Sequence, residues 1–398
     1  MKYDFDEIIV RTNTNCMSLE GFRSYLFHDT EGTMEFPYKD EEFIRMWIAD
    51  MEFATPQFIL DAMKTRLDRR ILGYSRVFNL EYYNTFKKWA ERRYGWLCNK
   101  EHIVTCQGIV PALHQLVGYI TKPDEKVLIF TPAYKHFKGA PDWHDRELVC
   151  SDLVNENGYY KIDFDDFSQK AADPKTTLCI FCNPHNPTGR IWSEEELKKV
   201  VDICKRNNIY IISDEIHCDL LRSGLQHIPM AKVVPDYDMI VTCMAPSKTF
   251  NMAGALLGNL VIPDDNLRKI WKAKRYINDN PVSIAGFQAA YDYGEEWLEE
   301  LRIYLDGNFE YLRKYIAEYL PEAKFRIPEA TYLGWVDIGY YLPNDNELPK
   351  FFANNAGVLL EGGNMFVQNS DGFIRLNVAC PRAILQEGLK QISEALLK

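Results

Sequence analysis

The chain has 398 residues, of which 46% are hydrophobic and 26% are charged, so it can bury a large core, and its length favours two domains over one. The formal net charge of -11 argues against a protein that binds nucleic acid or an anionic membrane surface, because both attract basic surfaces. We therefore expect a protein that acts on small molecules.

The N-terminal segment, residues 1–48, shows no regular alternation of strand and helix patterns. Its first ten residues, MKYDFDEIIV, are acidic and lack the apolar core of a signal peptide. No apolar run in the sequence has the length of a membrane span. These features predict a cytoplasmic protein without a membrane partner.

Short apolar runs alternate with helical patterns between about residue 100 and residue 262. The runs are rich in Ile and Val and lack polar alternation, as do parallel strands buried on both faces. They are KVLIF (126–130), TLCIF (177–181), IYIIS (209–213), MIVTC (239–243) and LLGNLVI (256–262). A capping-box pattern, Ser193 with Glu196, starts the helix expected before IYIIS. The pattern predicts an α/β sheet with crossover helices.

Two cysteines stand close together in one of these runs, Cys179 and Cys182. A Cys-x-x-Cys pair can bind zinc or carry out redox chemistry, but no second pair follows at metal-binding spacing. In a strand, these two positions also point to opposite faces. We therefore predict two small core residues and no metal site.

The pattern changes after about residue 285. A long charged and aromatic helix is expected over 295–320, followed by the strand-like runs YLGWVDI and GFIRLNV and a last helix. We predict a large domain over residues 49–285 and a smaller α+β domain over 286–398, on which residues 1–48 pack.

Four segments lie at the carboxyl ends of predicted strands or just after them, where open α/β sheets bind ligands. In the first, Gly108 precedes a helical pattern with Pro111 in its first turn. The amides of Gly108, Ile109 and Val110 could then face an anion such as phosphate. Taken alone, a simple turn before a helix explains the same residues.

The second segment, NPHNPTGR (183–190), contains two prolines and a glycine that make a stiff turn. Such a loop can hold Asn186 rigidly enough for a fixed hydrogen bond to a ligand oxygen. A plain strand-to-helix turn explains the prolines but not the second asparagine.

The third and fourth segments each place a charged residue beside a buried strand. Asp214 ends the run IYIIS, where a carboxylate is costly unless a cation pairs with it. A pyridinium N–H would serve, and so would a salt bridge within the core. Lys248 lies among small and apolar residues, which lower the pKa of a lysine and favour Schiff-base formation. By default, a lysine is only a solvated surface charge.

In this order and spacing, the segments resemble fold-type I pyridoxal 5′-phosphate (PLP) enzymes, the aspartate aminotransferase superfamily. In particular, the chain looks like the cystathionine β-lyase-like carbon–sulfur (C–S) lyases of the MalY/PatB type. The resemblance runs over nearly the whole chain and implies a mostly parallel seven-stranded sheet, a smaller domain and bound PLP. It is carried by WIADMEFATP (47–56), LGYS (72–75), GIVPAL (108–113), NPHNPTGRIW (183–192), SDEIHCDL (213–220), APSKTFNMAG (245–254) and FIRLNVACPR (373–382).

The resemblance implies three catalytic residues: Lys248 holds PLP as a Schiff base, Asp214 pairs with the pyridine nitrogen and Tyr134 stacks on the ring. Asn186 is expected to hydrogen-bond to the phenolic oxygen, and His217 to contact the cofactor. The other cofactor-binding residues, expected around the phosphate, are Gly108, Ile109, Val110, Ser247 and Tyr74.

The resemblance also implies how substrate binds. Arg375 is expected to clamp the α-carboxylate, a bidentate task that suits a guanidinium, and Asn186 and Tyr74 are expected to contact the substrate. Tyr74 would reach into the partner subunit's site, which implies a homodimer with shared active sites.

Several positions depart from the family patterns. His217 stands where many aminotransferases have a tyrosine, Leu256 where they carry a phosphate-binding arginine, and Ala245 replaces a serine. The phosphate is therefore expected to depend more on helix amides, Ser247 and Tyr74. The lyase branch usually has a Lys-Trp or Lys-Tyr pair where this chain has residues 18–19. An insert over about 21–44 follows, and we expect it to cover the site entrance.

The expected reaction is α,β-elimination from L-cystathionine or a related cysteine thioether, which gives a thiol, pyruvate and ammonia. Lys248 is the expected general base for the Cα proton. The alternative is a class I/II amino-acid aminotransferase, in which a keto acid accepts the amine. A non-catalytic regulator with this fold is a third possibility, but the intact set of Lys248, Asp214, Asn186 and Arg375 speaks against it.

Overall fold

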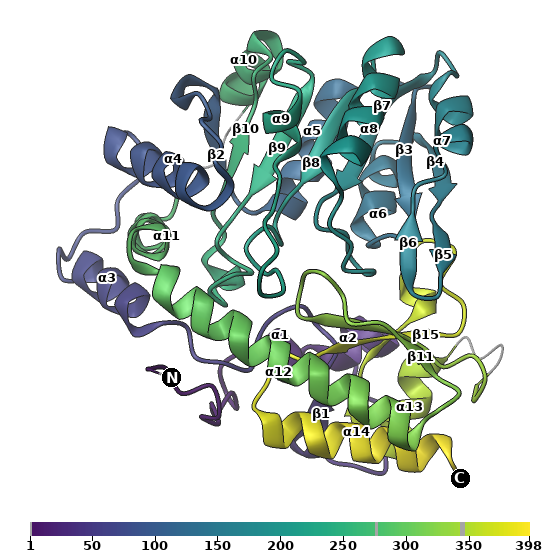
Figure 1. Ribbon diagram of the computed structural model, residues 1–398. Helices are drawn as coiled ribbons and strands as arrows, with labels where there is room; N and C mark the ends of the chain where they lie inside the picture. The colour runs from purple at the N-terminus through teal and green to yellow at the C-terminus, as the bar shows by residue number, and fades with distance from the viewer. Residues whose placement is uncertain (1, 275–277, 343–346) are drawn as a thin grey trace.

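The structure is a computed structural model that describes residues 2–274, 278–342 and 347–398, and its largest layer is a seven-stranded sheet (Figure 1). In spatial order the strands are β2 (Ile103–Cys106), β10 (Gly258–Val261), β9 (Ile240–Met244), β8 (Tyr210–Asp214), β7 (Thr176–Cys182), β3 (Lys126–Thr131) and β4 (Glu147–Asp152). The five strands from β9 to β4 in this order run parallel to their neighbours, which confirms the predicted mostly parallel α/β sheet.

Strand β10 is the exception, because it pairs antiparallel with both β2 and β9. The prediction of a parallel strand over 256–262 is therefore wrong in direction, although the strand itself is present. The run is apolar because the strand is buried on both faces. This burial does not depend on whether the strand runs parallel or antiparallel to its neighbours. Strand β4, which the apolar runs did not indicate, is an edge strand with mostly half-buried residues.

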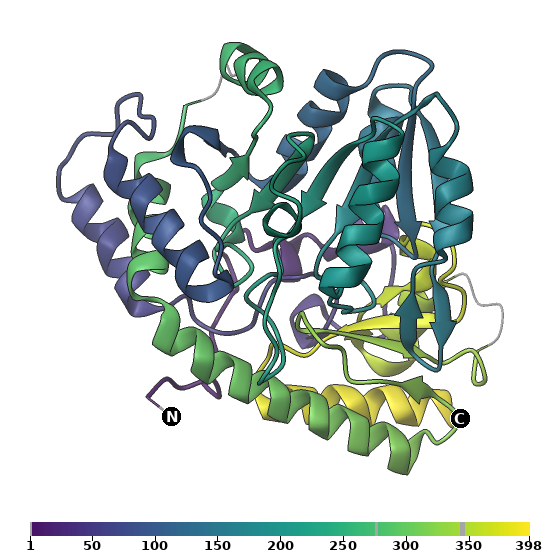
Figure 2. The same cartoon turned by 45° about the horizontal axis from the view of Figure 1, so that its top comes forward.

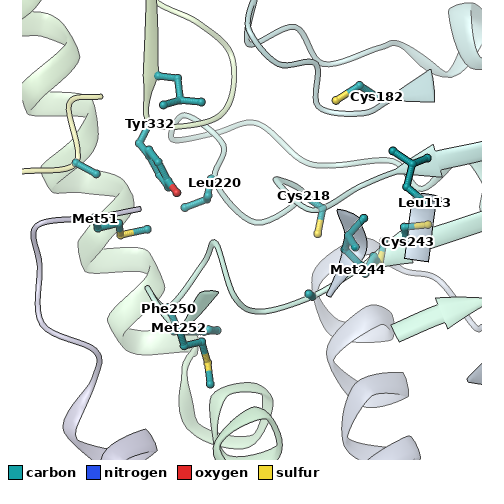
Figure 3. Packing of buried hydrophobic residues seen from close by; sticks show 14 of the residues in the cluster. Met51, Leu113, Cys182, Cys218, Leu220, Cys243, Met244, Phe250, Met252 and Tyr332 are labelled. Atoms are coloured by element: carbon teal, nitrogen blue, oxygen red, sulfur yellow. The ribbon is translucent and has the colours of Figure 1, made fainter. Parts of the chain in front are cut away.

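Both faces of the sheet are covered by helices. Along β3, Val127 and Ile129 belong to one buried cluster, whereas Leu128 and Phe130 belong to a second cluster on the opposite face. The first face is packed by α5 (Ile109–Ile120), α6 (His136–Trp143) and α10 (Asp265–Lys274), and the second by α7 (Phe164–Ala171), α8 (Glu194–Arg206) and α9 (Met230–Val233). Figure 3 shows part of the first cluster, in which Cys243 and Met244 of β9 lie with Leu113 of α5.

The structure confirms two predictions, the burial of the strand cysteines and the capping box at the start of α8. Cys179 and Cys182 are both buried, and they belong to the clusters on opposite faces of the sheet. Within the part of the chain that the structure describes, no group of His, Cys, Asp and Glu could hold a metal ion. At the start of α8, Ser193 Oγ accepts from the Glu196 amide at 3.2 Å, and Glu196 Oε2 accepts from the Ser193 amide at 2.8 Å.

A second, four-stranded antiparallel sheet lies below the first in Figure 1. Its order is β11 (Lys324–Phe325), β12 (Leu333–Asp337), β15 (Phe373–Asn377) and β14 (Glu361–Gly362), so the runs YLGWVDI and GFIRLNV form its two central strands. Its helices are α12 (Glu295–Tyr319), α13 (Leu348–Ala356) and α14 (Arg382–Leu396), and α12 and α14 lie side by side (Figure 2).

The N-terminal segment joins this second part of the chain. Strand β1 (Ile44–Arg45) pairs in parallel with β13 (Val358–Leu359), and Lys2 forms an ion pair with Glu296 of α12. The predicted domain boundary at residue 285 falls inside α11 (Pro281–Tyr293), which packs against α3 (Gln57–Leu67) and α4 (Leu80–Tyr94). The division of the chain at that residue stays a prediction.

The remaining short elements are α1 (Met17–Glu20), α2 (Phe22–Phe27), the hairpin β5 (Val154–Glu156) with β6 (Tyr159–Lys161), and the 3-10 turns η1 (Asp40–Glu42), η2 (Lys100–His102), η3 (Ala253–Ala255) and η4 (Gly363–Met365). Among the helices of the described residues, none combines the length and the apolar character needed to cross a bilayer.

Candidate active site

A cavity of about 250 Å³ lies where β7 and β8 end and where the loops after β3 and β9 begin. This is the edge of the sheet at which the sequence places its four segments. Residues predicted for the site and found in the cavity wall are Ile109, Val110, Tyr134, Asn186, Asp214, His217, Lys248 and Arg375. Segments that are far apart in the sequence therefore converge on one space.

Three other predicted residues do not line this cavity. Gly108 and Ser247 each precede a lining residue, and Gly108 is the N-cap of α5 with a φ of +96°, a conformation that favours glycine. The side chain of Tyr74 is 96% exposed, so in the single chain it lies outside its own cavity. Leu256, where aminotransferases carry an arginine, is 59% exposed.

Lys248 follows β9, and its Nζ donates a hydrogen bond to the Ala49 carbonyl at 2.6 Å. Burial lowers the pKa of this amine, whereas the nearby charge of Asp50 opposes that effect. The next residue, Thr249, donates through Oγ1 to Asp219 at 3.0 Å, and Asn251 Nδ2 donates to the Met51 carbonyl at 2.9 Å. The lysine therefore sits in a loop that hydrogen bonds hold on its C-terminal side.

Asp214 ends β8 with its carboxylate almost fully buried. Its Oδ1 accepts a hydrogen bond from the Ile216 amide at 3.2 Å. No cation of the described residues forms an ion pair with it. Burial raises its pKa to about 6, because a buried carboxylate without a partner is costly to ionise. The group is therefore suited to a cationic ligand.

The raised pKa of Asp214 gives a stability prediction for the protein without bound ligand. The folded protein keeps a proton that the unfolded chain has lost, so stability falls as pH rises from about 4, the ordinary carboxyl pKa, to about 6, the folded pKa. We expect Asp214→Asn to remove this penalty and to raise the free energy of unfolding by about 3 kcal/mol above pH 7. The gain should shrink as the pH falls below 6.

Denaturant unfolding of the ligand-free proteins between pH 5 and pH 8 measures this difference. Asp202→Asn, at an exposed position on α8, is the matched control and should give no such trend. An Asp214→Asn protein with the same pH dependence as the wild type would contradict the buried, unpaired carboxylate.

Arg375 of β15 is 2% exposed and occupies the opposite wall. Its Nη1 donates to Asn186 Oδ1 at 3.0 Å, its Nη2 donates to the Trp47 carbonyl at 3.3 Å, and it forms an ion pair with Glu361. Its Nε has no hydrogen-bond partner among the described residues. The guanidinium is thus fixed in place with one buried donor left for a ligand.

Two of the predicted ring residues, Tyr134 and His217, also line the cavity. Tyr134 packs against His136, with ring centroids 5.1 Å apart, and burial raises the pKa of the Tyr134 phenol. Burial lowers the pKa of His217 to about 3, so its ring is neutral, and its Nδ1 has no partner within the described chain. A neutral imidazole can accept or donate one hydrogen bond to a ligand.

Sequence reasoning missed part of this wall. Glu361 faces the cavity from β14, and Met17 and Ile48 reach it from the N-terminal segment. Tyr25 lies within the insert over about 21–44 that was expected to cover the entrance. The signal for Glu361 was a single acid beside the apolar run VLL (358–360). Nothing in the sequence alone places Tyr25 there, because its position depends on packing against Trp47, 4.9 Å away between ring centroids.

The charged groups and the helix N-terminus of the cavity wall define which ligand it could hold. A buried carboxylate calls for a cation, a buried amine of lowered pKa can react with an aldehyde, and the first residues of α5 present a helix N-terminus that suits an anion. A ligand with a protonated ring nitrogen, an aldehyde and a phosphate meets all three conditions. PLP has these groups, so the residues present fit it.

The chain matches known proteins over most of its length. The family model described as aminotransferase class I and II matches residues 41–392. The cystathionine β-lyase PatB of Bacillus subtilis is 38% identical over 356 residues, which cover 88% of this chain and 92% of that protein.

Solved structures agree over the whole length. The PLP-bound C–S lyase of Staphylococcus hominis, in complex with the inhibitor L-cycloserine, is 49% identical with a TM-score of 0.96, covering 99% of this chain and 98% of that one. Cystalysin of Treponema denticola, which contains PLP, is 30% identical with a TM-score of 0.92, and the match covers 100% of both chains.

Proposed function

The chain belongs to the class I and II aminotransferase family and is a PLP-dependent C–S lyase, and we propose that it cleaves L-cystathionine or related cysteine thioethers. The reaction is α,β-elimination, in which the thioether gives a thiol, pyruvate and ammonia. The observation that carries the proposal is the convergence of Lys248, Asp214 and Arg375 on one cavity. This arrangement occurs in a chain that matches C–S lyases over its length.

Each cofactor contact is assigned to a residue of the site. Lys248 would hold the cofactor through Nζ, Asp214 would pair with the protonated ring nitrogen, and Tyr134 would contact the ring. Asn186 and His217 are the polar residues available to the ring oxygen. The residues available to the phosphate are the α5 N-terminus at Gly108, Ile109 and Val110, Ser247, and Tyr74 from the partner. When bound, PLP supplies an electron sink for the negative charge that develops at Cα.

The substrate is held and deprotonated by the chain itself. Arg375 binds the α-carboxylate, for which its Nε is the unpartnered donor, and its contacts with Asn186 and Glu361 keep the guanidinium oriented. The Lys248 amine, whose pKa burial lowers, is the base that takes the Cα proton.

A homodimer with shared sites is supported by the surface around Tyr74. The side chains of large apolar residues are exposed there without cover in the single chain, namely Leu67, Ile71, Leu72, Tyr74, Phe78 and Leu80. Contiguous exposed apolar surface marks a protein interface. A second copy that covers this surface would bring Tyr74 to the partner's phosphate site.

Mixing two defective variants tests the shared site. We expect Lys248→Ala to be inactive and Tyr74→Ala to be about tenfold impaired, because a charge-assisted contact to the phosphate is lost. After dissociation and reassociation, mixed dimers contain one site with both native residues, so the mixture should be more active than the average of the two. A mixture of Lys248→Ala with Asp214→Asn is the control, since each dimer then lacks an intact site. Equal behaviour of both mixtures would contradict the exchange of Tyr74.

We also propose a cytoplasmic location. All ten cysteines are free, as is usual for proteins of a reducing compartment. Fractionation of the native cells, with the enzyme activity followed against cytoplasmic and exported markers, tests the proposal.

The reaction type is tested with purified protein, added PLP and L-cystathionine, without a keto acid. Release of a free thiol together with pyruvate is the expected result. If no product forms until a keto acid is added, the chain acts as an aminotransferase and the proposed elimination is wrong.

A further inference from the structure

A second cavity, of about 530 Å³, lies beside the reaction cavity. Tyr25 lines both spaces. Phe366 lines the second cavity, and its ring centroid lies 5.1 Å from the guanidinium of Arg375, which lines the first. Lys135, in the wall of the second cavity, directly follows Tyr134 in the wall of the first. The two spaces are therefore neighbours separated by single side chains.

Lys135 is the distinctive charge in the second cavity. Its Nζ lies 3.5 Å from the centroid of the Tyr25 ring, and within the described chain no carboxylate forms an ion pair with it. The other two lysines of this wall are paired, Lys138 with Asp142 at 2.5 Å and Lys350 with Glu347 at 3.5 Å. The charge of Glu361 acts on Lys135 from the reaction cavity, but no carboxylate is in direct contact with this half-buried ammonium, so it is suited to an anionic ligand.

The proposed function fixes the direction in which a substrate extends. The α-carboxylate is held at Arg375 and the amine lies at Lys248, so both ends of the amino-acid part are occupied. Of the lining residues without a proposed cofactor contact, Met17, Tyr25 and Ile48 come from the N-terminal segment. Tyr25 also lines the second cavity, where its ring contacts Lys135, so a sulfur substituent that extends along these three residues reaches Lys135.

We propose that the second cavity is the subsite for the thiol part of the substrate and that Lys135 binds a carboxylate carried by that part. The inference rests on the proposed C–S lyase function and narrows its substrate class to thioethers whose leaving group carries a carboxylate. L-Cystathionine belongs to this class, because its thiol product bears a carboxylate. Lys135 is a specificity residue and takes no part in the proton transfer at Cα.

Two substrates of the same shape but different charge distinguish an effect of charge on binding from an effect of size. S-(2-carboxyethyl)-L-cysteine carries the carboxylate, and S-(2-carbamoylethyl)-L-cysteine is its neutral isostere. We expect the wild-type holoenzyme to have a KM about tenfold lower for the carboxylate, as for a charge-assisted hydrogen bond. In Lys135→Met, KM for the carboxylate should rise about tenfold, with less than about a twofold change for the amide. Lys135→Arg should retain the preference, because it keeps the charge.

Lys198→Met is the matched control, because Lys198 lies on the surface of α8 and pairs with Glu194. It should leave both KM values unchanged. Equal values for the two substrates in the wild type, or an equal effect of Lys135→Met on both, would overturn the subsite. Calorimetric binding of the two compounds to the holoenzyme decides the same question if neither is turned over. In that case the subsite is judged from the binding preference, and the proposed elimination is judged separately from pyruvate release with L-cystathionine.

Discussion

Lys248→Ala should lower kcat for elimination by about 10³-fold or more and remove the visible absorbance of the bound cofactor. Two functions are lost together. The general base that takes the Cα proton is worth about 10²–10⁴-fold on its own, and the amine that holds the cofactor is missing as well. Burial lowers the pKa of this amine. The described part of the cavity wall contains no second lysine that could replace it.

The measurement combines turnover, absorbance and borohydride reduction followed by mass spectrometry of the intact protein. Wild-type protein should gain the mass of the reduced cofactor at Lys248, and Lys248→Ala should gain none. Lys198→Ala, which removes a surface lysine of α8, should behave as wild type. If the coloured form persists in Lys248→Ala and is still fixed by borohydride, the assignment of the anchoring lysine is wrong.

Asp214→Asn should keep PLP bound but lower elimination by about 10²–10³-fold. The cofactor is still anchored by Lys248, but the ring nitrogen loses the carboxylate that keeps it protonated, so the electron sink is weaker. Turnover is measured with saturating substrate, and cofactor content is measured after release by alkali. Unchanged turnover at full cofactor occupancy would refute the pairing with the ring nitrogen.

The same substitution separates chemistry from folding. In the ligand-free protein, Asp214→Asn is expected to be more stable at neutral pH, because the buried carboxylate has no cation there. A loss of activity together with a gain in stability cannot be explained by damage to the fold. It is the result expected for a charged group that is kept for function at a cost in stability.

Much of the fold could be predicted from local patterns. The runs that became β3, β7, β8 and β9 are apolar along their whole length because both faces of the sheet are covered by helices. An apolar run does not indicate the direction of its strand. The strand β10 was expected to be parallel, but it is antiparallel to β9. The edge strand β4 was missed because its residues are mostly half-buried and its run, ELVCSD, is mixed.

The same distinction holds for the site. Three site residues lie at or just after the carboxyl ends of buried strands, namely Asn186, Asp214 and Lys248. They converge because β7, β8 and β9 are parallel neighbours in the sheet. Glu361 and Tyr25 reach the cavity through contacts between distant segments, which no spacing in the sequence encodes. Of these two residues, Tyr25 lies in the wall that the substrate side chain is proposed to contact.

The central claim is that this chain catalyses elimination and regenerates its cofactor without a second substrate. The most direct test counts the pyruvate formed from L-cystathionine per enzyme site, with keto acids removed beforehand. If the enzyme catalyses elimination, pyruvate forms in large excess over enzyme sites, and the cofactor is still in its aldehyde form at the end. Product limited to one equivalent per site, with the cofactor converted to its amine form, would contradict it.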